Sequence, residues 1–322
     1  MNTTRARRLT IGLDVEPGWA GIVALSQPTP GRFLLRAASV AELSESIPAE
    51  EVIQDLRAEV GARSEGIRCN LGPASVIVHE TQFPDMPVDD LRSAARIEAG
   101  QLIPDLDQMV LDFQVIGHPT TQEGARQVRV MIVAAPRQAL EERTALLARA
   151  RLRVLSLVPD GIALANAVSV LRPPEESADV LLAVGPDSTV LVAVMPAAKA
   201  MAPVVRYVPG GVDALGLDGK PSPADPRAAE HAKDQWLQEV ERSVQFVSSK
   251  LDTPAQRILV VGDGADSPPL LDWIKQNLAI AVHSWNPLNF LGRDTSAPSD
   301  NFVKEHGPHL AVAVGLALME EA

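Results

Sequence analysis

The chain has 322 residues, 46% of them hydrophobic and 22% charged, with a formal net charge of −12. These values predict a globular protein of one large domain or two. The acidity, with clustered basic residues only at Arg5, Arg7 and Arg8, argues against nucleic acid or anionic lipid as a direct partner. The single cysteine, Cys69, excludes an intrachain disulfide and a cysteine-based metal cluster. The apolar stretch at 9–25 is interrupted by acidic residues, so it predicts neither a signal peptide nor a membrane span, and we expect a cytosolic protein.

The first half of the chain predicts alternating strands and helices. We expect strands at 9–15, 19–25, 33–40 and 74–83, and a helix over 50–61. A second unit follows Pro84 in the order helix, strand, strand, helix, over 88–104, 109–116, 127–135 and 137–151. A strand and an alanine-rich helix then fill 152–171, and the sequence RPPEES indicates a linker at 172–178.

The second half predicts a hairpin, a long helix and a final α/β segment. The expected order is a hairpin at 181–194, a strand within 201–211, a loop at 212–227, a helix at 228–251, a strand, glycine turn and helix over 257–278, a strand with a loop over 281–291, and a helix at 310–321. The long helix places one apolar stripe on a single face: Trp236, Leu237, Val240, Val244, Val247 and Leu251. We expect the last helix, which is apolar, to pack into the second half of the chain.

The hairpin LLAVGPDSTVLVAV, residues 181–194, has a glycine turn followed by two hydroxyls. Backbone N–H groups and hydroxyls in such a turn often hold a phosphate. Residues 10–25 show the same order of strand, glycine turn and strand, so a duplicated unit would leave a cleft between the two turns that suits a nucleotide. The simpler interpretation is a tight strand connection, because turns favour these residues for local reasons.

The segment FPDMPVDDLRSAARIEAGQLIPDLDQMVLDFQVIG, residues 83–117, resembles the signature region of the PilM family of actin-like proteins in type IV pilus assembly. The shared features are a P-x-M-P turn before an acidic helix, an E-A-x-x-x-I-P helix end and a V-x-L-D-F/Y strand. The resemblance continues through 180–194, 262–288 and 307–318, and so extends over nearly the whole chain. The order and spacing of these pieces are specific, whereas one glycine turn alone would be weak evidence.

The resemblance implies a two-domain actin-like α/β fold, similar to that of the cell-division protein FtsA, with an inserted subdomain in the first half. The first actin-like subdomain is then 9–83 with 154–172, and the inserted subdomain is 84–153. The second actin-like domain is 179–322, in which 212–251 is a reduced remnant of the subdomain that closes over a nucleotide.

The resemblance also implies a nucleotide site, and this chain departs from it in the first turn. Relatives with an intact site resemble D-I-G-x-S/T there, whereas this chain has Asp14, Val15, Glu16, Pro17 and Gly18. Glu16 replaces the glycine that would approach the phosphates, and Pro17 removes an N–H donor. A carboxylate aimed at a triphosphate is repulsive.

The second turn has lost its acidic residue, because Ala183 replaces the aspartate that would hold Mg²⁺. The third turn, Gly262-Asp263-Gly264, is a milder departure. The candidate nucleotide-binding residues of this degenerate site are Asp14, Gly18, Gly185, Ser188, Thr189, Gly262 and Gly264. We therefore expect no catalytic residue, metal or cofactor, and binding of ATP with Mg²⁺ is disfavoured.

The resemblance implies a non-enzymatic adaptor of a type IV pilus or type II secretion-like assembly platform. Its partner would be the cytoplasmic tail of a PilN-like bitopic membrane protein, held in a groove between the first subdomain and the inserted one, with the motor ATPases as further candidates. The protein would then be cytoplasmic, reaching the inner face of the inner membrane only through partners. The alternative is an ATP-controlled switch that uses Ser188, Thr189 and the turn at 262–264.

Three other residues could suggest chemistry. His306 and His309 could be metal ligands, but no carboxylate or cysteine cluster accompanies them in the sequence, so we interpret both as surface residues. Cys69 has no histidine nearby and is predicted to be a buried, inert thiol ahead of a strand. The sequence does not predict which residues bind the partner.

Overall fold

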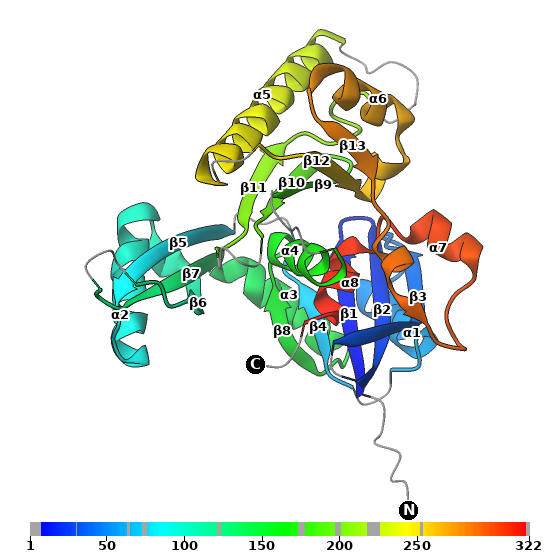
Figure 1. The fold of residues 1–322 in the computed structure, drawn as a ribbon. Helices are drawn as coiled ribbons and strands as arrows, with labels where there is room; N and C mark the ends of the chain where they lie inside the picture. The colour runs from blue at the N-terminus through cyan, green and yellow to red at the C-terminus, as the bar shows by residue number, and fades with distance from the viewer. Residues whose placement is uncertain are drawn as a thin grey trace, which may run out of the picture.

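The computed structural model describes residues 8–29, 31–62, 65–72, 76–120, 124–172, 178–196, 201–217, 226–251 and 254–319. Their strands form three sheets of six, five and three strands. Figure 1 shows these sheets in three parts, two stacked one above the other and a third projecting to the side. The core of the expected linker, 173–177, lies outside the described residues, as do Arg5, Arg7 and residues 218–225 of the expected loop.

The first sheet contains the chain's opening strands. Its order is β14 (Gly292–Arg293), β3 (Arg32–Glu42), β2 (Trp19–Thr29), β1 (Arg8–Glu16), β4 (Ile67–Asn70) and β8 (Val154–Val158). Strands β1 to β3 are antiparallel neighbours, whereas β4 and β8 run parallel to β1. Helices α1 (Ala49–Glu59) and α3 (Arg137–Arg149) share a buried core with Ile11 and Leu13 of β1. Because helices cover both faces, β2 is an almost continuous apolar run.

The second sheet has the order β11 (Val204–Pro209), β10 (Ser188–Val194), β9 (Asp179–Val184), β12 (Arg257–Val261) and β13 (Ala281–Ser284). Its outer face is covered by α5 (Pro226–Leu251) and α6 (Pro268–Asn277), and Trp236 of α5 is fully buried in the core beneath them. Helices α4 (Asp160–Leu171) and α8 (Ala311–Ala317) form a layer between this sheet and the first one. Each of these two sheets, with the helices on it, forms one unit; we call them the first and the second actin-like unit. The two units therefore share this middle layer.

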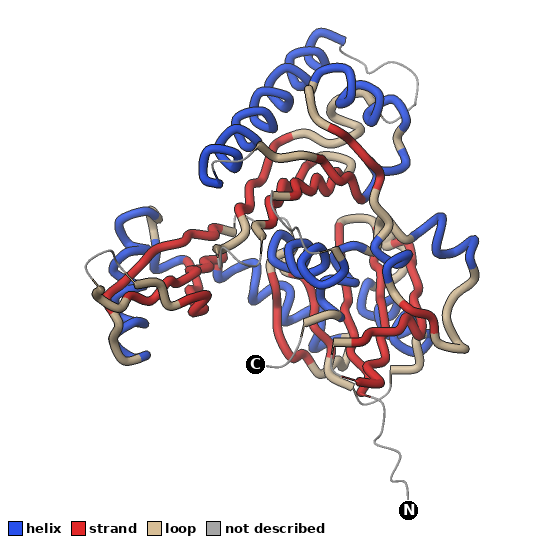
Figure 2. Tube along the Cα trace, viewed as in Figure 1, coloured by secondary structure: helices blue, strands red, loops and turns tan. Residues whose placement is uncertain are grey.

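The third sheet has the order β5 (Ile77–Pro84), β7 (Gln127–Pro136) and β6 (Met109–Gly117), all antiparallel, and α2 (Val88–Leu102) packs on it. We call these four elements the inserted unit, and Figure 2 shows its strands apart from the two larger sheets. The short elements are η1 (Leu106–Gln108), η3 (Gly262–Asp266), η4 (Pro287–Phe290) and α7 (Asp300–His306). Within the described ranges, no helix combines the length and apolarity needed to span a bilayer.

The expected position of the C-terminal helix was wrong. Helix α8 packs against β1, β2 and β4 of the first sheet, and β14 pairs with β3 in that same sheet. The chain after β13 therefore returns to the first actin-like unit, although the sequence assigned all of 179–322 to the second. An apolar helix shows no preference for one of two apolar sheets, so the sequence alone could not place it.

The boundaries of the inserted unit also differ from expectation. Strand β5 pairs with β7 over its whole length, so the unit begins before Pro84. Helix α3, which was assigned to the insertion, buries Leu147 in the core of the first sheet. Strand β4 was missed altogether, because it has only four residues and two of them, Arg68 and Asn70, are polar although buried. Cys69 lies within this strand, fully buried, and not ahead of a strand.

Candidate functional site

A cavity of about 180 Å³ lies between the two actin-like units. We call it the cleft. Its walls come from the β1–β2 turn, the β9–β10 turn, the turn η3, the start of α4 and the segment before α8. The expectation that the two hairpin turns border one cavity is therefore confirmed.

The predicted nucleotide-site residues divide into two groups. Asp14, Gly185, Ser188 and Gly262 line the cleft. The other three lie away from it: Gly18 is exposed at a hairpin tip, Thr189 is fully buried behind the second turn, and Gly264 is buried against Val184. The structure thus brings together four of the seven predicted residues.

The first turn is a two-residue hairpin that pairs Glu16 with Trp19. Pro17 and Gly18 occupy its centre, and Gly18 has a φ of +87°. Proline followed by a glycine with positive φ is the pattern of a type II turn. The Gly18 carbonyl accepts a hydrogen bond from Leu43 N at 2.8 Å, which fixes the turn to the end of β3. This turn has only one free central N–H to offer, because proline has none.

The second turn is held from behind by the loop that follows β11. Val212 N donates to Gly185 O at 2.9 Å, and Asp213 N donates to Pro186 O at 3.0 Å. The Thr189 hydroxyl donates to Gly210 O at 2.7 Å and accepts from Trp236 Nε1 at 2.9 Å. Its donor and one acceptor position are therefore used inside the second unit.

Three carboxyl groups meet at the floor of the cleft: Asp14, Glu16 and Asp160. Burial is the largest cause that raises the pKa of each, and for Asp14 and Glu16 the neighbouring carboxyls raise it further. The pKa of Asp14 lies well above its ordinary value of 3.8, that of Glu16 rises to about 10, and that of Asp160 rises to about 6. Burial and the neighbouring carboxyls therefore favour the protonated forms of Asp14 and Glu16.

The neighbouring residues satisfy only part of this cluster. Asn70 Nδ2 donates to Glu16 Oε1 at 2.8 Å, and Gly72 N donates to Asp160 Oδ1 at 3.2 Å. Asp14 is 2% exposed, yet its Oδ1 has no hydrogen-bond partner among the described residues. The guanidinium of Arg143 favours the ionised form of all three carboxyls.

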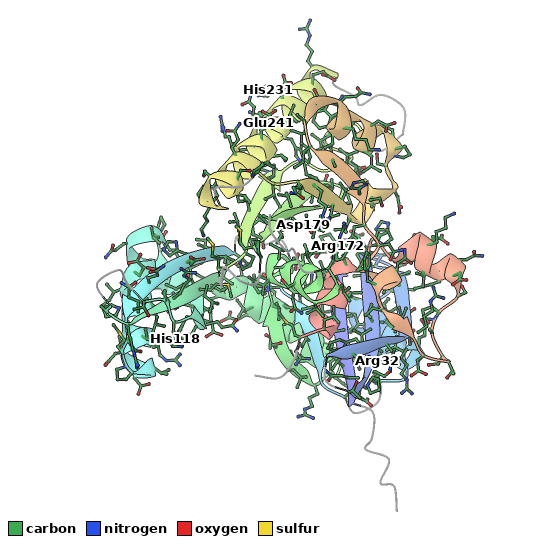
Figure 3. All side chains as sticks on the ribbon, in the orientation of Figure 1. Arg32, His118, Arg172, Asp179, His231 and Glu241 are labelled. Atoms are coloured by element: carbon green, nitrogen blue, oxygen red, sulfur yellow. The ribbon has the colours of Figure 1, made fainter. Side chains whose placement is uncertain are left out.

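Neither Cys69 nor the described acidic residues form an obvious metal or nucleophilic site. Burial raises the pKa of the Cys69 thiol to about 12, which agrees with the predicted inert thiol. Within the described ranges, no three histidine, cysteine, aspartate or glutamate residues are grouped so that they could hold one metal ion. Two further histidines, His118 on the inserted unit and His231 on α5, lie far from the junction of the two actin-like units (Figure 3).

The third turn is linked across the cleft by a histidine. His309 Nε2 lies 2.8 Å from Asp266 Oδ2, and His309 Nδ1 lies 3.6 Å from Asp263 Oδ1. The Trp19 ring meets the imidazole edge to face, with a centroid distance of 6.4 Å. His309 was interpreted as a surface residue without acidic neighbours, but the fold supplies two carboxylates from a turn more than forty residues earlier.

Sequence reasoning also missed Asp160 as a site residue. Asp160 is the first residue of α4 and directly follows the β8 strand and Pro159. An acidic residue at the first position of a helix that directly follows a strand indicates a carboxyl group at the end of that strand. Asp160 is distant from the glycine turns in the sequence, so the sequence alone does not predict that they line the same cleft.

A second and larger concavity lies between the inserted unit and the first actin-like unit. We call it the groove; its volume is about 740 Å³. Ile116 and Met131 line it from the inserted unit, Leu155 from β8, and Ile162 from α4. Strands β6 and β8, which both contribute to its walls, are the edge strands of their sheets.

The comparisons with known proteins agree with this architecture. The family model described as "Type IV pilus assembly protein PilM" matches residues 38–190. A chain of the solved "PilM-PilN type IV pilus biogenesis complex" is 24% identical, with 97% of this chain and 98% of that chain covered and a TM-score of 0.77. No curated protein sequence matches the chain.

Two more distant solved structures are also similar in outline. The ethanolamine utilization protein EutJ from Carboxydothermus hydrogenoformans is 14% identical over 99% of this chain and 92% of that one, with a TM-score of 0.48. The cytoplasmic domain of EpsL, an inner membrane component of the type II secretion system of Vibrio cholerae, is 8% identical over 98% and 97%, with a TM-score of 0.49.

Two sheets that enclose a cleft, with an inserted unit beside the first, define the chain as an actin-like α/β protein, which confirms the predicted fold class. The chain is similar to PilM in sequence over residues 38–190 and in fold over nearly its whole length.

Proposed function

We propose that this chain is a non-enzymatic adaptor in type IV pilus assembly. In this proposal it holds the cytoplasmic tail of a PilN-like membrane protein in the groove. The groove supports this function most directly, because it lies between the inserted unit and the first actin-like unit, where the family resemblance predicts a peptide. The solved complex that resembles this chain contains, by its title, PilM and PilN.

The chemistry of the groove suits an extended peptide. Ile116, Met131 and Leu155 offer apolar contacts, whereas Gln114 and Asn166 offer polar ones. Leu155 is 40% exposed on β8, so its side chain is open to contact with a peptide. A peptide beside an edge strand also gains main-chain hydrogen bonds.

The cleft favours an adaptor over a nucleotide-driven enzyme. Its volume of about 180 Å³ is below the roughly 300–1,000 Å³ of usual ligand pockets. Glu16 and Asp14 lie at its floor, where a phosphate would meet carboxyl oxygens, and Pro17 offers no N–H. In the second turn Ala183 lines the wall at the position where an aspartate would hold Mg²⁺.

The same proposal sets the protein's place in the cell. Contact with the tail of a PilN-like protein would hold the chain on the inner face of the inner membrane. Motor ATPases of a pilus or secretion system would be further partners. This location depends on the groove and requires no membrane-binding segment in the chain itself.

Isothermal titration with a peptide that copies the tail of a PilN-like protein tests the proposal. We expect micromolar binding, and we expect Ile116→Asp to weaken it at least tenfold, since a charge replaces an apolar contact. Val110→Asp is the matched control, because Val110 lies on the same strand but lines a different concavity beside α3. Equal affinity of the Ile116 variant and the control variant, or no peptide binding by the wild type, would overturn the proposal.

A further inference from the structure

The floor of the cleft holds more acidic groups than basic ones. Asp14, Glu16 and Asp160 interact with one another and with a single guanidinium, that of Arg143. Ionised carboxylates in a buried site need positive partners, and without them the groups take up protons. One cation cannot balance three carboxylates, so the cluster is completed either by protons or by an added positive group.

One atom of this cluster points to the added group. Asp14 lines the cleft, is 2% exposed and shares a hydrogen bond with the Glu16 carboxyl, while no N–H group or hydroxyl of the described residues donates to its Oδ1. Most buried polar atoms are hydrogen-bonded, so such an atom needs an explanation. A donor placed in the cavity would supply the missing hydrogen bond.

Part of the cavity wall is apolar, and one side is aromatic. Leu164, Val190 and Val312 contribute apolar side chains to its lining, and Trp19 borders it. Apolar walls suit a short hydrocarbon stem, and an indole ring attracts a cation. A volume of about 180 Å³ corresponds to roughly six water molecules at about 30 Å³ each, which accommodates a small organic ion.

We propose that the cleft binds a free small organic cation, an alkylammonium or guanidinium group on a short apolar stem, with Asp14 as its buried hydrogen-bond acceptor. This ligand class differs from a nucleotide, which would bring negative charge to the same carboxyls. It also differs from a metal ion, because the described residues contain no three ligands grouped for one. The inference concerns the cleft alone and does not depend on peptide binding in the groove.

Binding of a cation should depend on pH, because the groups around it titrate. The cluster itself contains Asp14, Glu16 and Asp160, and burial raises the pKa of each. The other titratable or charged groups that face it are Arg143, Cys69, Tyr207, Asp187, Asp263 and His309. A bound cation favours ionised carboxylates, so binding releases protons and becomes tighter as the pH rises.

The test is isothermal titration of the full chain with n-butylguanidinium chloride and with n-butylurea, its neutral counterpart of nearly the same shape. Titrations at pH 7 and 8.5, each in two buffers of different ionisation heat, measure proton release. We expect butylguanidinium to bind, to release protons, and to bind several-fold tighter at pH 8.5, whereas butylurea gives no binding. Equal binding of both probes, or no binding of butylguanidinium at millimolar concentration, would contradict the inference.

Variants locate the site. Asp14→Asn should weaken butylguanidinium binding at least tenfold, whereas Asp107→Asn, at a side chain 94% exposed on the inserted unit, should leave it unchanged. If Asp14→Asn does not fold, Glu16→Gln replaces it and should reduce the number of protons released. If binding and proton release are unchanged in the cleft variants, the ligand binds elsewhere. If MgCl₂ binds more tightly and displaces the probe, the site belongs to a metal ion. Either result would overturn the inference.

Discussion

The Thr189 hydroxyl lies between a carbonyl and an indole. It donates to Gly210 O and accepts from Trp236 Nε1, and its side chain is fully buried. A hydroxyl in a glycine turn suits a phosphate by residue type, but here it joins the β9–β10 hairpin to the long helix α5. At the first turn, Glu16 likewise receives its hydrogen bond from Asn70 of the adjacent strand β4. Both side chains therefore contribute to the fold through specific partners.

Replacement of Thr189 by valine tests its structural role. Thr189→Val keeps the shape but leaves the buried Trp236 N–H and the Gly210 carbonyl without this partner, so we expect a loss of about 1–3 kcal/mol in the free energy of unfolding. Thr189→Ser keeps the hydroxyl and should lose about 1 kcal/mol or less with the methyl group. Urea denaturation measures both, and a serine variant less stable than the valine variant would disprove the assigned role.

The pH dependence of stability tests the protonated state of Glu16. Its pKa is about 10 in the fold against an ordinary 4.5, so between pH 6 and 9 the folded state holds a proton that the unfolded chain lacks. Linkage then makes stability fall as the pH rises, by up to about 1.4 kcal/mol per pH unit for one such group. Asp160, with a pKa of about 6, contributes mainly between its ordinary pKa of 3.8 and about pH 6.

We therefore expect the melting temperature of the wild type to fall from pH 6 to pH 9, and Glu16→Gln, which retains the acceptor for Asn70, to show a shallower fall. Glu305→Gln is the control, because that side chain is 74% exposed. Melting followed by circular dichroism measures the slopes. A wild-type melting temperature that stays level or rises with pH would contradict the raised pKa.

Among the elements, helix α8 depends on close approach. A Cβ atom on Gly315 would lie 1.9 Å from Ala163 O of α4, and one on Gly12 of β1 would lie 2.0 Å from Ala313 O of α8. Glycine on both sides lets α8 lie directly between β1 and α4. This contact fixes the C-terminal helix in the layer between the two sheets, and with it the segment that positions His309 at the cleft.

Two glycine-to-alanine changes separate packing from helix propensity. Gly315→Ala should destabilise the fold by about 1–3 kcal/mol or more, because the new methyl meets backbone that cannot move freely. Gly100→Ala, in α2, would place its new Cβ atom 3.8 Å from Leu106 Cδ2 and should be neutral or stabilising by about 0.5–1 kcal/mol. Chemical denaturation of both variants provides the comparison. Similar effects at the two positions would show that close packing of α8 is not essential.

The sequence predicted the elements with strong local signals. The helix expected at 228–251 is α5, Pro226–Leu251, and the one expected at 88–104 is α2, Val88–Leu102, since each has a clear apolar stripe and a proline nearby. The short strand β4 has no such signal. All four of its residues are buried by neighbouring parts of the fold, which the local sequence does not indicate. The contacts of α8 and α3 depend on tertiary packing, which periodicity does not encode.

The candidate site was predictable to a similar extent. Glycine turns are visible in the sequence, so Gly185 and Gly262 were found at the cleft. The burial of Thr189 behind its turn depends on Trp236, which is more than forty residues away. The groove was predicted only as a location by family resemblance, because its wall residues come from three parts of the chain and share no motif.

In the whole molecule, the groove connects all three parts. Met201 and Ala202, which lead into β11 of the second unit, complete the walls formed by the inserted unit and the first unit. Glu80 of β5 accepts a hydrogen bond from Ala202 N at 2.8 Å and lies 3.4 Å from Lys250 Nζ of α5. The inserted unit is therefore tied by polar contacts to the second actin-like unit at the wall of the groove.

The most direct test of the proposed adaptor function is a paired calorimetric titration of one sample of the full chain, first with MgATP and then with the peptide that copies the PilN-like tail. We predict no binding of MgATP and micromolar binding of the peptide that is unchanged by the nucleotide. Tight binding of MgATP that alters the affinity for the peptide would contradict the account and indicate a nucleotide-controlled switch.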